Sequence, residues 1–489
     1  MFIHGGAFFL GAGTRYYYDP IAFVRTATTL DPPAPLIFVA INYRLGALGF
    51  LHSPASMSTD HPVPANNGLH DQLRALEWVQ RHIAGFGGDP DNVTVLGQSA
   101  GGESVSLHVA SGQGRGLFKR AVAFSGTSVT MPAKTPEEHE RNFREQAEKL
   151  GVRVRGKSAE EVARAMQEVD VEKIRELGWV GAPCTSSEAM PDERASMWVN
   201  RSGRSDRRPK PDEWLESQII STTTYDGSIS YIMTRNNPER KRHAAAIKSI
   251  AVDVLGEDAA GELLDIYDIK PEGAESEDVA LRKICLFESD IGFFAAALSV
   301  AIGAAKEADA GDATKASSSS SRTETTTFLQ IFSFGNPFPG PLEQGKFASH
   351  TWDIVALLGA FDDEVKTIEE ESHLSNPGYK PYTTILAWRE RLIRYMTAGE
   401  ALGPEFGEMS HPKASEKGET GGKEKEGTYG AALMVGNEGM SEQGPEVYLD
   451  GEDGGRRRRL LELAERCKGE DGWDVFWEGV CRRFLMAGE

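Results

Sequence analysis

The segment Val93-Thr94-Val95-Leu96-Gly97-Gln98-Ser99-Ala100-Gly101-Gly102 carries the strongest fold signal in the chain. Its β-branched start predicts a short buried strand, and the residues from Glu103 onward favour a helix. Between them stands the pattern G-x-S-x-G, in which glycines permit a sharp turn that exposes the serine hydroxyl. An ordinary glycine-rich turn is the alternative, but the flanking strand and helix favour Ser99 as a nucleophile.

The surrounding residues, 1–130, alternate between strand-like and helix-like segments. This alternation predicts a parallel, doubly wound sheet flanked by helices, an α/β fold with helical insertions farther along the chain. The expected elements are strands at 36–42, 92–96 and 119–124 and helices at 68–83 and 99–110.

A second glycine-rich motif, His4-Gly5-Gly6-Ala7-Phe8, lies upstream of Ser99. It matches the HGG-type loops that line oxyanion holes, where small residues let backbone N–H groups approach a developing negative charge. The N–H of Ala100, the residue after the nucleophile, is a further expected donor. Loss of one such donor costs about 2.7–4 kcal/mol.

A nucleophilic serine on this fold is followed in sequence by an acid and then by a histidine. That order leaves four histidines: His243, His350, His373 and His411. We favour His350, because it follows a strand-like segment, 328–334, and a Gly/Pro-rich loop. The alternative is a capping or core histidine.

Asp226 is the favoured acid, because it directly follows the strand-like segment 218–225. A carboxylate there would hold the imidazole in one tautomer and stabilise its charged form. A turn aspartate is an equally good interpretation, since Asp-Gly is a common turn pair.

Composition excludes several other classes of function. The net charge of −20 opposes binding to nucleic acid or to anionic lipid. The four cysteines lack metal-ligand spacing, so we expect no metal site, and nothing calls for a cofactor. The longest apolar run, 291–305, is shorter than the about 20 residues of a membrane span, so we expect no transmembrane segment. The compartment, secreted or cytoplasmic, stays open.

The domain organisation follows from shifts in composition. We expect a catalytic α/β domain over residues 1–400, interrupted by a flexible Ser/Thr-rich insertion at 308–327. Residues 401–455 are rich in Gly, Glu and Lys and predict low-complexity disorder. Residues 456–489 predict a helical tail that opens with a solvated basic cluster, Arg456 to Arg459.

Taken together, the motifs resemble the type-B carboxylesterase/lipase family of α/β hydrolases, which includes cholinesterases and fungal lipases. The matching stretches are His4 to Phe8, Asn42-Tyr43-Arg44-Leu45-Gly46, Asn67-Gly68-Leu69 with Asp71-Gln72, Phe86 to Pro90 and Gly97 to Gly102.

The resemblance implies hydrolysis of a small-molecule or lipid ester by Ser99, Asp226 and His350 through an acyl-enzyme. It places oxyanion donors at Gly6, Ala7 and Ala100, and a buried structural ion pair between Arg44 and Asp71.

Two departures from the family pattern stand out. Gln98 occupies a position where many members carry Glu. Members also carry a segment before the HGG loop, so we expect the upstream part to be missing and a sheet edge to be exposed. A non-catalytic, cholinesterase-like binding module or an inactive truncated relative is therefore the alternative function.

Overall fold

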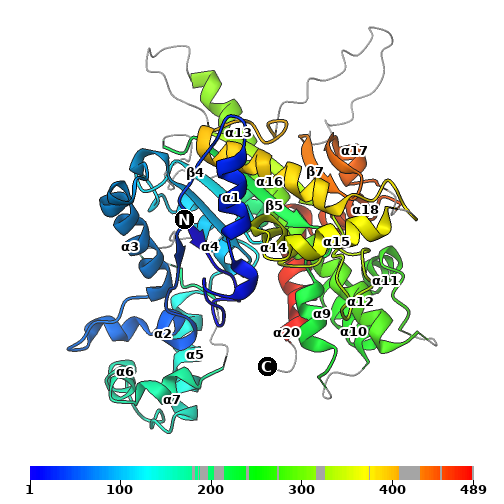
Figure 1. Ribbon diagram of the computed structural model, residues 1–489. Coiled ribbons are helices and arrows are strands. Elements are labelled where there is room, and N and C mark those ends of the chain that lie inside the picture. The colour runs from blue at the N-terminus through cyan, green and yellow to red at the C-terminus, as the bar shows by residue number, and fades with distance from the viewer. Residues whose placement is uncertain are drawn as a thin grey trace.

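A central sheet with helices on both faces organises the computed structural model (Figure 1). The structure describes residues 1–178, 182–185, 187, 196–202, 214–237, 242–271, 275–314, 325–373, 375–406, 430–451 and 454–486. The α/β-hydrolase architecture predicted from the sequence is confirmed.

The sheet has eight strands in the order β2-β1-β3-β4-β5-β6-β7-β8. All neighbours are parallel except β7 and β8, which are antiparallel. The carboxyl ends of β3, β5 and β6 therefore lie at one edge of the sheet, where ligands bind in open α/β folds. The strands are β1 (Phe2–Ile3), β2 (Ala40–Ile41), β3 (Thr94–Gln98), β4 (Arg120–Phe124), β5 (Ser217–Thr223), β6 (Thr326–Phe332), β7 (Ala432–Gly436) and β8 (Gly439–Gln443).

Alternating side chains divide each central strand between two cores. Leu96, Val122 and Ile219 belong to the core on the face turned to the viewer in Figure 1, whereas their neighbours Val95 and Ile220 belong to cores on the other face. Both faces are apolar, as expected of a parallel sheet covered by helices on both sides. The viewer's face is covered by α1 (Ile21–Thr29), α14 (Trp352–Leu358), α15 (Asp362–Ser372) and α16 (Pro381–Ala398).

Two groups of helices cover the far face. The first group, α3 (Asn67–His82) and α4 (Ala100–Ala110), packs on β1, β3 and β4. The second group packs on β5 to β7 and is formed by α8 (Met197–Ser202), α9 (Ser228–Thr234), α10 (His243–Leu255), α11 (Glu257–Ile266), α12 (Glu277–Glu288), the π-helix η6 (Ser289–Phe294), α13 (Ala295–Thr314), α17 (Pro445–Tyr448), α18 (Arg456–Lys468), α19 (Gly472–Asp474), the π-helix η9 (Val475–Arg482) and α20 (Arg483–Met486).

A small satellite core lies apart from the sheet. It contains three helices between residues 135 and 176. Capping boxes begin two of them, at Thr135 with Glu138 and at Ser158 with Glu161, and satisfy backbone N–H groups there. The members are α2 (Gly46–Phe50), α5 (Pro136–Lys149), α6 (Ala159–Gln167) and α7 (Val171–Arg175).

The prediction of disorder over 401–455 was wrong for part of that segment. β7 joins the sheet beside β6, and β8 pairs with β7 through a tight hairpin. Ala432, Leu433 and Val435 are buried there, and β7 gains its stability from this tertiary pairing rather than from local composition. Residues 407–429 lie outside the described residues.

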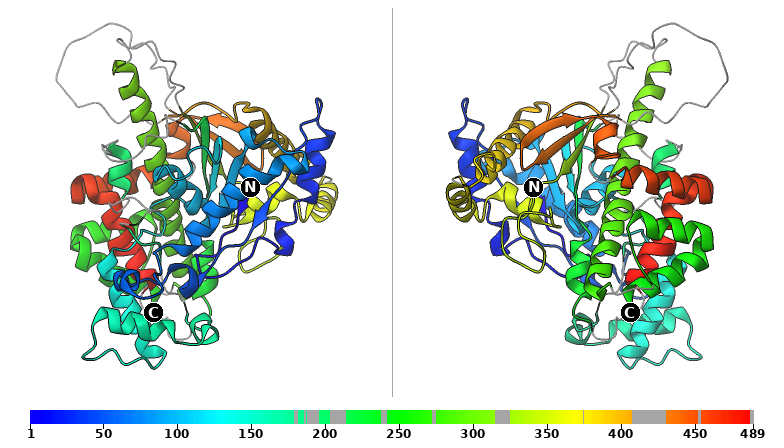
Figure 2. Two further views of the ribbon diagram at one scale, coloured as in Figure 1. Left: turned by 90° about the vertical axis from the view of Figure 1, so that its left-hand side faces the viewer. Right: turned by 90° about the vertical axis from the view of Figure 1, so that its right-hand side faces the viewer.

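The basic cluster at the start of α18 is not a solvated helix start. Arg456 and Arg457 both bond the carboxylate of Asp290, which is fully buried in η6. The tail thus packs into the main body, and Figure 2 shows α18 to α20 (red) beside α10 to α12 (green). Asp290 precedes these two arginines by 166 and 167 residues, so the local pattern at 456–459 could not reveal the contact.

The apolar run 291–305 lies in a continuous helical region, Glu277–Lys306. This region is long and apolar enough to cross a bilayer, but 89% of its apolar window is buried inside the protein. The helix α13 continues to Thr314, into the first part of the insertion predicted to be flexible, and residues 315–324 lie outside the described ranges.

The strand predicted at 36–42 is shorter in the structure. Only Ala40 and Ile41 form β2, which pairs with β1 at the edge of the sheet. The Phe2 N–H of β1 also donates to the carbonyl of Val39, directly before β2, at 2.7 Å.

Candidate active site

Ser99 occupies a sharp turn between β3 and α4. Its φ of 57° and ψ of −126° lie outside the regions that L-residues favour, and such strain is typical of functional turns. Hydrogen bonds hold the turn, because the Ser99 N–H donates to the Phe124 carbonyl at 2.8 Å and the Glu103 N–H donates to the Ser99 carbonyl. A Cβ on Gly97 would overlap the Gly101 carbonyl, so glycine is required there.

Asp226 and His350 meet in two loops that follow neighbouring strands, β5 and β6. His350 Nδ1 lies 2.8 Å from Asp226 Oδ1. The other carboxylate oxygen, Oδ2, accepts from the Thr222 hydroxyl and the Thr223 N–H, both at 2.8 Å. Asp226 is completely buried, and these bonds fix its orientation toward the imidazole.

The backbone around His350 is fixed from the same side. The His350 N–H donates to the Ser228 hydroxyl at 2.8 Å, and Tyr225 and Ser349 form a parallel bridge. The ring of Phe293, from the π-helix η6, lies 5.3 Å from the imidazole. The imidazole can therefore turn little without disturbing these contacts.

Nε2 of His350 faces Gln98, the residue before Ser99. The Gln98 Nε2 lies 3.2 Å away, so the amide donates to an imidazole whose Nδ1 carries the proton for Asp226. Within the described part of the chain, no hydrogen bond joins the Ser99 hydroxyl to His350. The structure thus brings Ser99, Asp226 and His350 to one edge of the sheet, with Gln98 between two of them.

The HGG-type loop packs against the Ser99 turn. A Cβ added to Gly5 would lie 2.8 Å from the Ser99 Cβ. Ala7 and Phe8 both have positive φ, 51° and 57°, and Gly6 has a φ of 122°, so this loop holds an unusual backbone shape beside the serine. Ala100 is the first residue of α4, where N–H groups have no partner within the helix.

The other histidines lie elsewhere. His243 is buried at the start of α10, where its ring packs near Phe484. His373 is exposed at the end of α15, and His411 lies outside the described residues. Trp352 packs against Phe338 in the core.

Two buried carboxyl groups near Asp226 were missed by the sequence reasoning. Asp353 is completely buried in α14 and accepts from the Ser125 hydroxyl at 3.1 Å. Burial and then the charge of Asp226 raise its pKa to about 7. A lone acid in the apolar segment Trp352-Asp353-Ile354-Val355 was the signal available in the sequence.

Glu288 is the second buried carboxyl group. Its Oε1 accepts from the Ser230 hydroxyl at 2.8 Å, and its Oε2 has no partner among the described residues. Burial, with a further contribution from Asp226, raises its pKa to about 8. Both groups therefore hold their protons to higher pH than ordinary carboxyl groups do, which limits the negative charge around Asp226.

Arg44 and Asp71 form the expected ion pair, but it is not buried. Two bonds of 2.8 Å join the guanidinium to the carboxylate, and the Arg44 N–H adds a third at 2.9 Å. The side chains are 49% and 27% exposed. Although burial opposes it, hydrogen bonding from Arg44 lowers the pKa of Asp71. Solvent therefore screens a pair that the resemblance placed in the interior.

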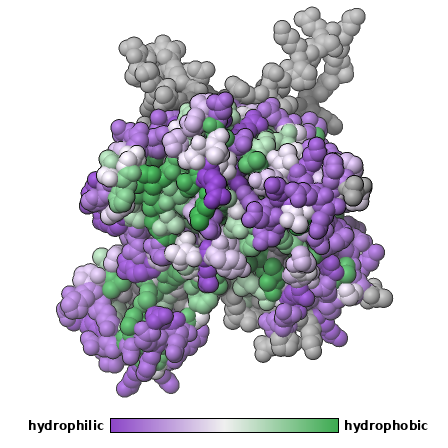
Figure 3. All heavy atoms as spheres, viewed as in Figure 1, coloured by the Kyte–Doolittle hydropathy of each residue, from purple (hydrophilic) through white to green (hydrophobic). Residues whose placement is uncertain are grey.

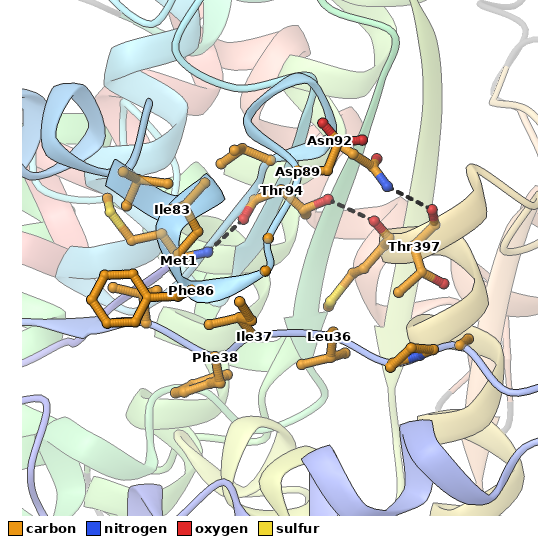
Figure 4. A pocket seen from close by; sticks show the side chains of 18 of the residues that line it. Met1, Leu36, Ile37, Phe38, Ile83, Phe86, Asp89, Asn92, Thr94 and Thr397 are labelled. Atoms are coloured by element: carbon orange, nitrogen blue, oxygen red, sulfur yellow. Dashed lines mark hydrogen bonds between the residues drawn. The ribbon is translucent and has the colours of Figure 1, made fainter. Parts of the chain in front are cut away.

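A cavity of about 550 Å³ lies at the opposite end of the strands. Its lining includes Met1 and Thr94, at the starts of β1 and β3, together with Ile37 and Phe86, which leave apolar surface exposed (Figure 3). Figure 4 shows the Met1 amino group donating to the Thr94 carbonyl at the wall of this cavity. The cavity is separate from the Ser99 edge.

Comparison with known proteins gives matches over much of the chain. The model of the carboxylesterase family matches residues 1–262. The para-nitrobenzyl esterase of Bacillus subtilis (strain 168) is 32% identical over 57% of this chain and 52% of its own length. Cholinesterase 1 of Branchiostoma lanceolatum is 36% identical over 37% of this chain and 47% of its own length. The bile salt-activated lipase of Homo sapiens is 41% identical over 27% of this chain and 16% of its own length.

Solved structures agree on the fold. A PNB esterase superposes with a TM-score of 0.58 at 20% identity, over 94% of this chain and 79% of that chain. A thermophilic PNB esterase gives 0.55, over 92% and 79%. The aligned part spans about half the length of the first two sequence relatives or less.

Proposed function

Since this chain belongs to the carboxylesterase family, we propose that it hydrolyses carboxylic esters with Ser99 as the nucleophile. The observation that carries the proposal is the hydrogen-bonded pair of His350 and Asp226 beside the strained Ser99 turn. A nucleophile, a base and a group that orients the base are the elements of a serine hydrolase.

In the proposed acylation, the Ser99 Oγ attacks the ester carbonyl carbon while Nε2 of His350 takes the hydroxyl proton. Asp226 stabilises the imidazolium through its bond to Nδ1. The carbonyl oxygen becomes an oxyanion, and the N–H groups of Gly6, Ala7 and Ala100 donate to it. The tetrahedral intermediate collapses, the C–O bond to the alcohol breaks, and His350 returns the proton to the leaving alcohol.

Deacylation repeats these steps with water. His350 takes a proton from the water, whose oxygen attacks the acyl carbon. The bond to Ser99 Oγ then breaks, the serine regains a proton from His350, and the carboxylic acid leaves.

The substrate is proposed as a small-molecule or lipid ester. The names of the relatives include a para-nitrobenzyl esterase, a cholinesterase and a bile salt-activated lipase, which differ in the alcohol or lipid they imply. We therefore commit to the ester bond and leave the alcohol and acyl groups open.

A non-catalytic, cholinesterase-like binding module or an inactive relative is the second candidate. One observation favours it: in the described structure His350 Nε2 contacts Gln98 and not Ser99. The missing contact does not exclude catalysis, because catalytic hydrogen bonds in apo active sites are often long and tighten only when substrate binds.

Hydrolysis of p-nitrophenyl butyrate separates the two candidates. If the protein is an ester hydrolase, the wild type should turn over this ester, and Ser99→Ala should lower the turnover by about 10³-fold or more. Ser111→Ala, at the far end of the same helix α4, is the matched control and should retain full turnover. Equal turnover in the wild-type protein and Ser99→Ala, both folded by circular dichroism, would reject the proposal.

A further inference from the structure

Gln98 directly precedes Ser99 and contacts His350, and the proposed mechanism gives it no task. Its side chain is almost completely buried at the end of β3, with Nε2 3.2 Å from His350 Nε2. The carbonyl end of the amide packs against Gly5, where an added Cβ would lie 2.8 Å from Oε1. The NH₂ end therefore faces the imidazole.

We propose that Gln98 is a positioning residue that keeps His350 unprotonated and ready to accept the Ser99 proton, which extends the activity to lower pH. This inference rests on the proposed ester hydrolysis for its kinetic test only. The physical basis is that a side-chain amide NH₂ can donate to the lone pair on neutral imidazole but not to an imidazolium N–H. A hydrogen bond made only to the neutral form disfavours protonation.

The contact also fixes the tautomer. With Gln98 donating to Nε2, the imidazole proton stays on Nδ1, where Asp226 accepts it at 2.8 Å. This is the tautomer in which Nε2 can act as a base toward Ser99. When substrate binds, the Ser99 hydroxyl competes with the amide for the same lone pair, and the amide need only swing aside.

Several charged or titratable groups surround His350. Asp226 faces Nδ1 directly, and the buried carboxyl of Asp353 acts on both of them. Glu288 acts on Asp226, and Tyr18 lies near Asp353. Asp226 favours a protonated imidazole, so a donor on the opposite nitrogen offsets its pull.

Two substitutions separate the possible roles of this position. Gln98→Met keeps the length of the side chain and removes the donor. Gln98→Glu keeps the shape and replaces the donor with an acceptor that favours the imidazolium. In each protein, kcat/KM falls at low pH with a midpoint that reports the protonation of His350. The proposal predicts that this midpoint is lowest in wild type, higher in Gln98→Met and highest in Gln98→Glu.

The expected shift for Gln98→Met is about one pH unit, so that kcat/KM at pH 6 falls about 10-fold. At pH 9, on the plateau above the acid limb, kcat/KM for Gln98→Met should stay within about 2-fold of wild type. Gln72→Met is the matched control, because Gln72 contacts another buried histidine, His108, at 2.8 Å. Its acid limb should not move.

A second measurement does not need activity. Histidine-selective ¹⁵N NMR titrations in the Ser99→Ala background follow the protonation of His350, which is identified by the signal lost in His350→Gln. The same order of midpoints across the three side chains at position 98 supports the inference even if no ester is turned over. Unchanged midpoints for both Gln98→Met and Gln98→Glu, or a downward shift for Gln98→Met, would overturn it.

Discussion

His350 Nδ1 lies 2.8 Å from Asp226 Oδ1, although the two residues are 124 positions apart in the sequence. Asp226 can only accept, so it holds the imidazole in the tautomer with Nδ1 protonated. In Asp226→Asn, the Thr222 hydroxyl and the Thr223 N–H would still donate to the oxygen of the new amide. Its NH₂ group would therefore face Nδ1 of His350. We expect kcat to fall about 10³–10⁴-fold through the wrong tautomer.

Steady-state kinetics at pH 8 would test this expectation, with Asp268→Asn on the surface as the control. A loss of less than about 10-fold in a folded Asp226→Asn protein would contradict the role given to Asp226.

Glu288 predicts how stability depends on pH. Its pKa is raised from 4.5 to about 8 in the folded protein, chiefly by burial, so the folded state binds the proton more tightly than the unfolded chain. The free energy of unfolding therefore falls as pH rises through this interval. Glu288→Gln cannot ionise, and its amide oxygen can still accept from Ser230.

Thermal melts of wild type and Glu288→Gln at pH 5 and pH 9 would measure this effect. The melting temperature of the variant relative to wild type should be higher at pH 9 than at pH 5. A difference that is constant with pH would mean that Glu288 does not ionise in this interval.

The exposure of the Arg44–Asp71 pair predicts a small contribution to stability. The side chains are 49% and 27% exposed, so water screens their attraction. Asp71→Asn should lower the free energy of unfolding by about 1 kcal/mol or less, measured in urea. A loss of about 3–5 kcal/mol would instead fit the buried pair that the family resemblance implied.

The ion pairs of Asp290 should contribute more to stability than the exposed Arg44–Asp71 pair does. Asp290 is completely buried and bonds both Arg456 and Arg457, whose charges lower its pKa even though burial opposes ionisation. Asp290→Asn leaves two buried cations without their counter-charge and should cost about 3–5 kcal/mol.

The matched control is Asp450→Asn, which breaks the more exposed bond to Arg458. It should cost about 1 kcal/mol or less. Similar urea midpoints for the two variants would show that the tail is not anchored through Asp290.

Local patterns predicted those parts of the fold in which strand, turn and helix follow directly in sequence. The turn at Ser99 and the strands before Asp226 and His350 are of this kind, because glycine placement and β-branched runs report local backbone shape. The pairing of β7 with β6 could not be predicted, since it depends on burial supplied by distant strands.

The same limit applies to the site. Chain order narrowed the histidines to four, and the strand-like segments before Asp226 and His350 favoured these two residues. The contact between Gln98 and His350 could not be predicted, because it depends on how two loops meet. The raised pKa of Glu288 depends on its burial against α9. This burial comes from tertiary packing and could not be predicted from the sequence of the helix that carries Glu288.

Covalent labelling tests the central claim, that Ser99 is the nucleophile of an ester hydrolase, more directly than turnover does. The protein would be treated with an alkyl fluorophosphonate, and the modified residue identified by peptide mass spectrometry. We predict one adduct per chain, on Ser99, that is absent from Ser99→Ala and slowed at least about 10²-fold in His350→Gln. An adduct on another residue, or none on a folded protein, would contradict the account.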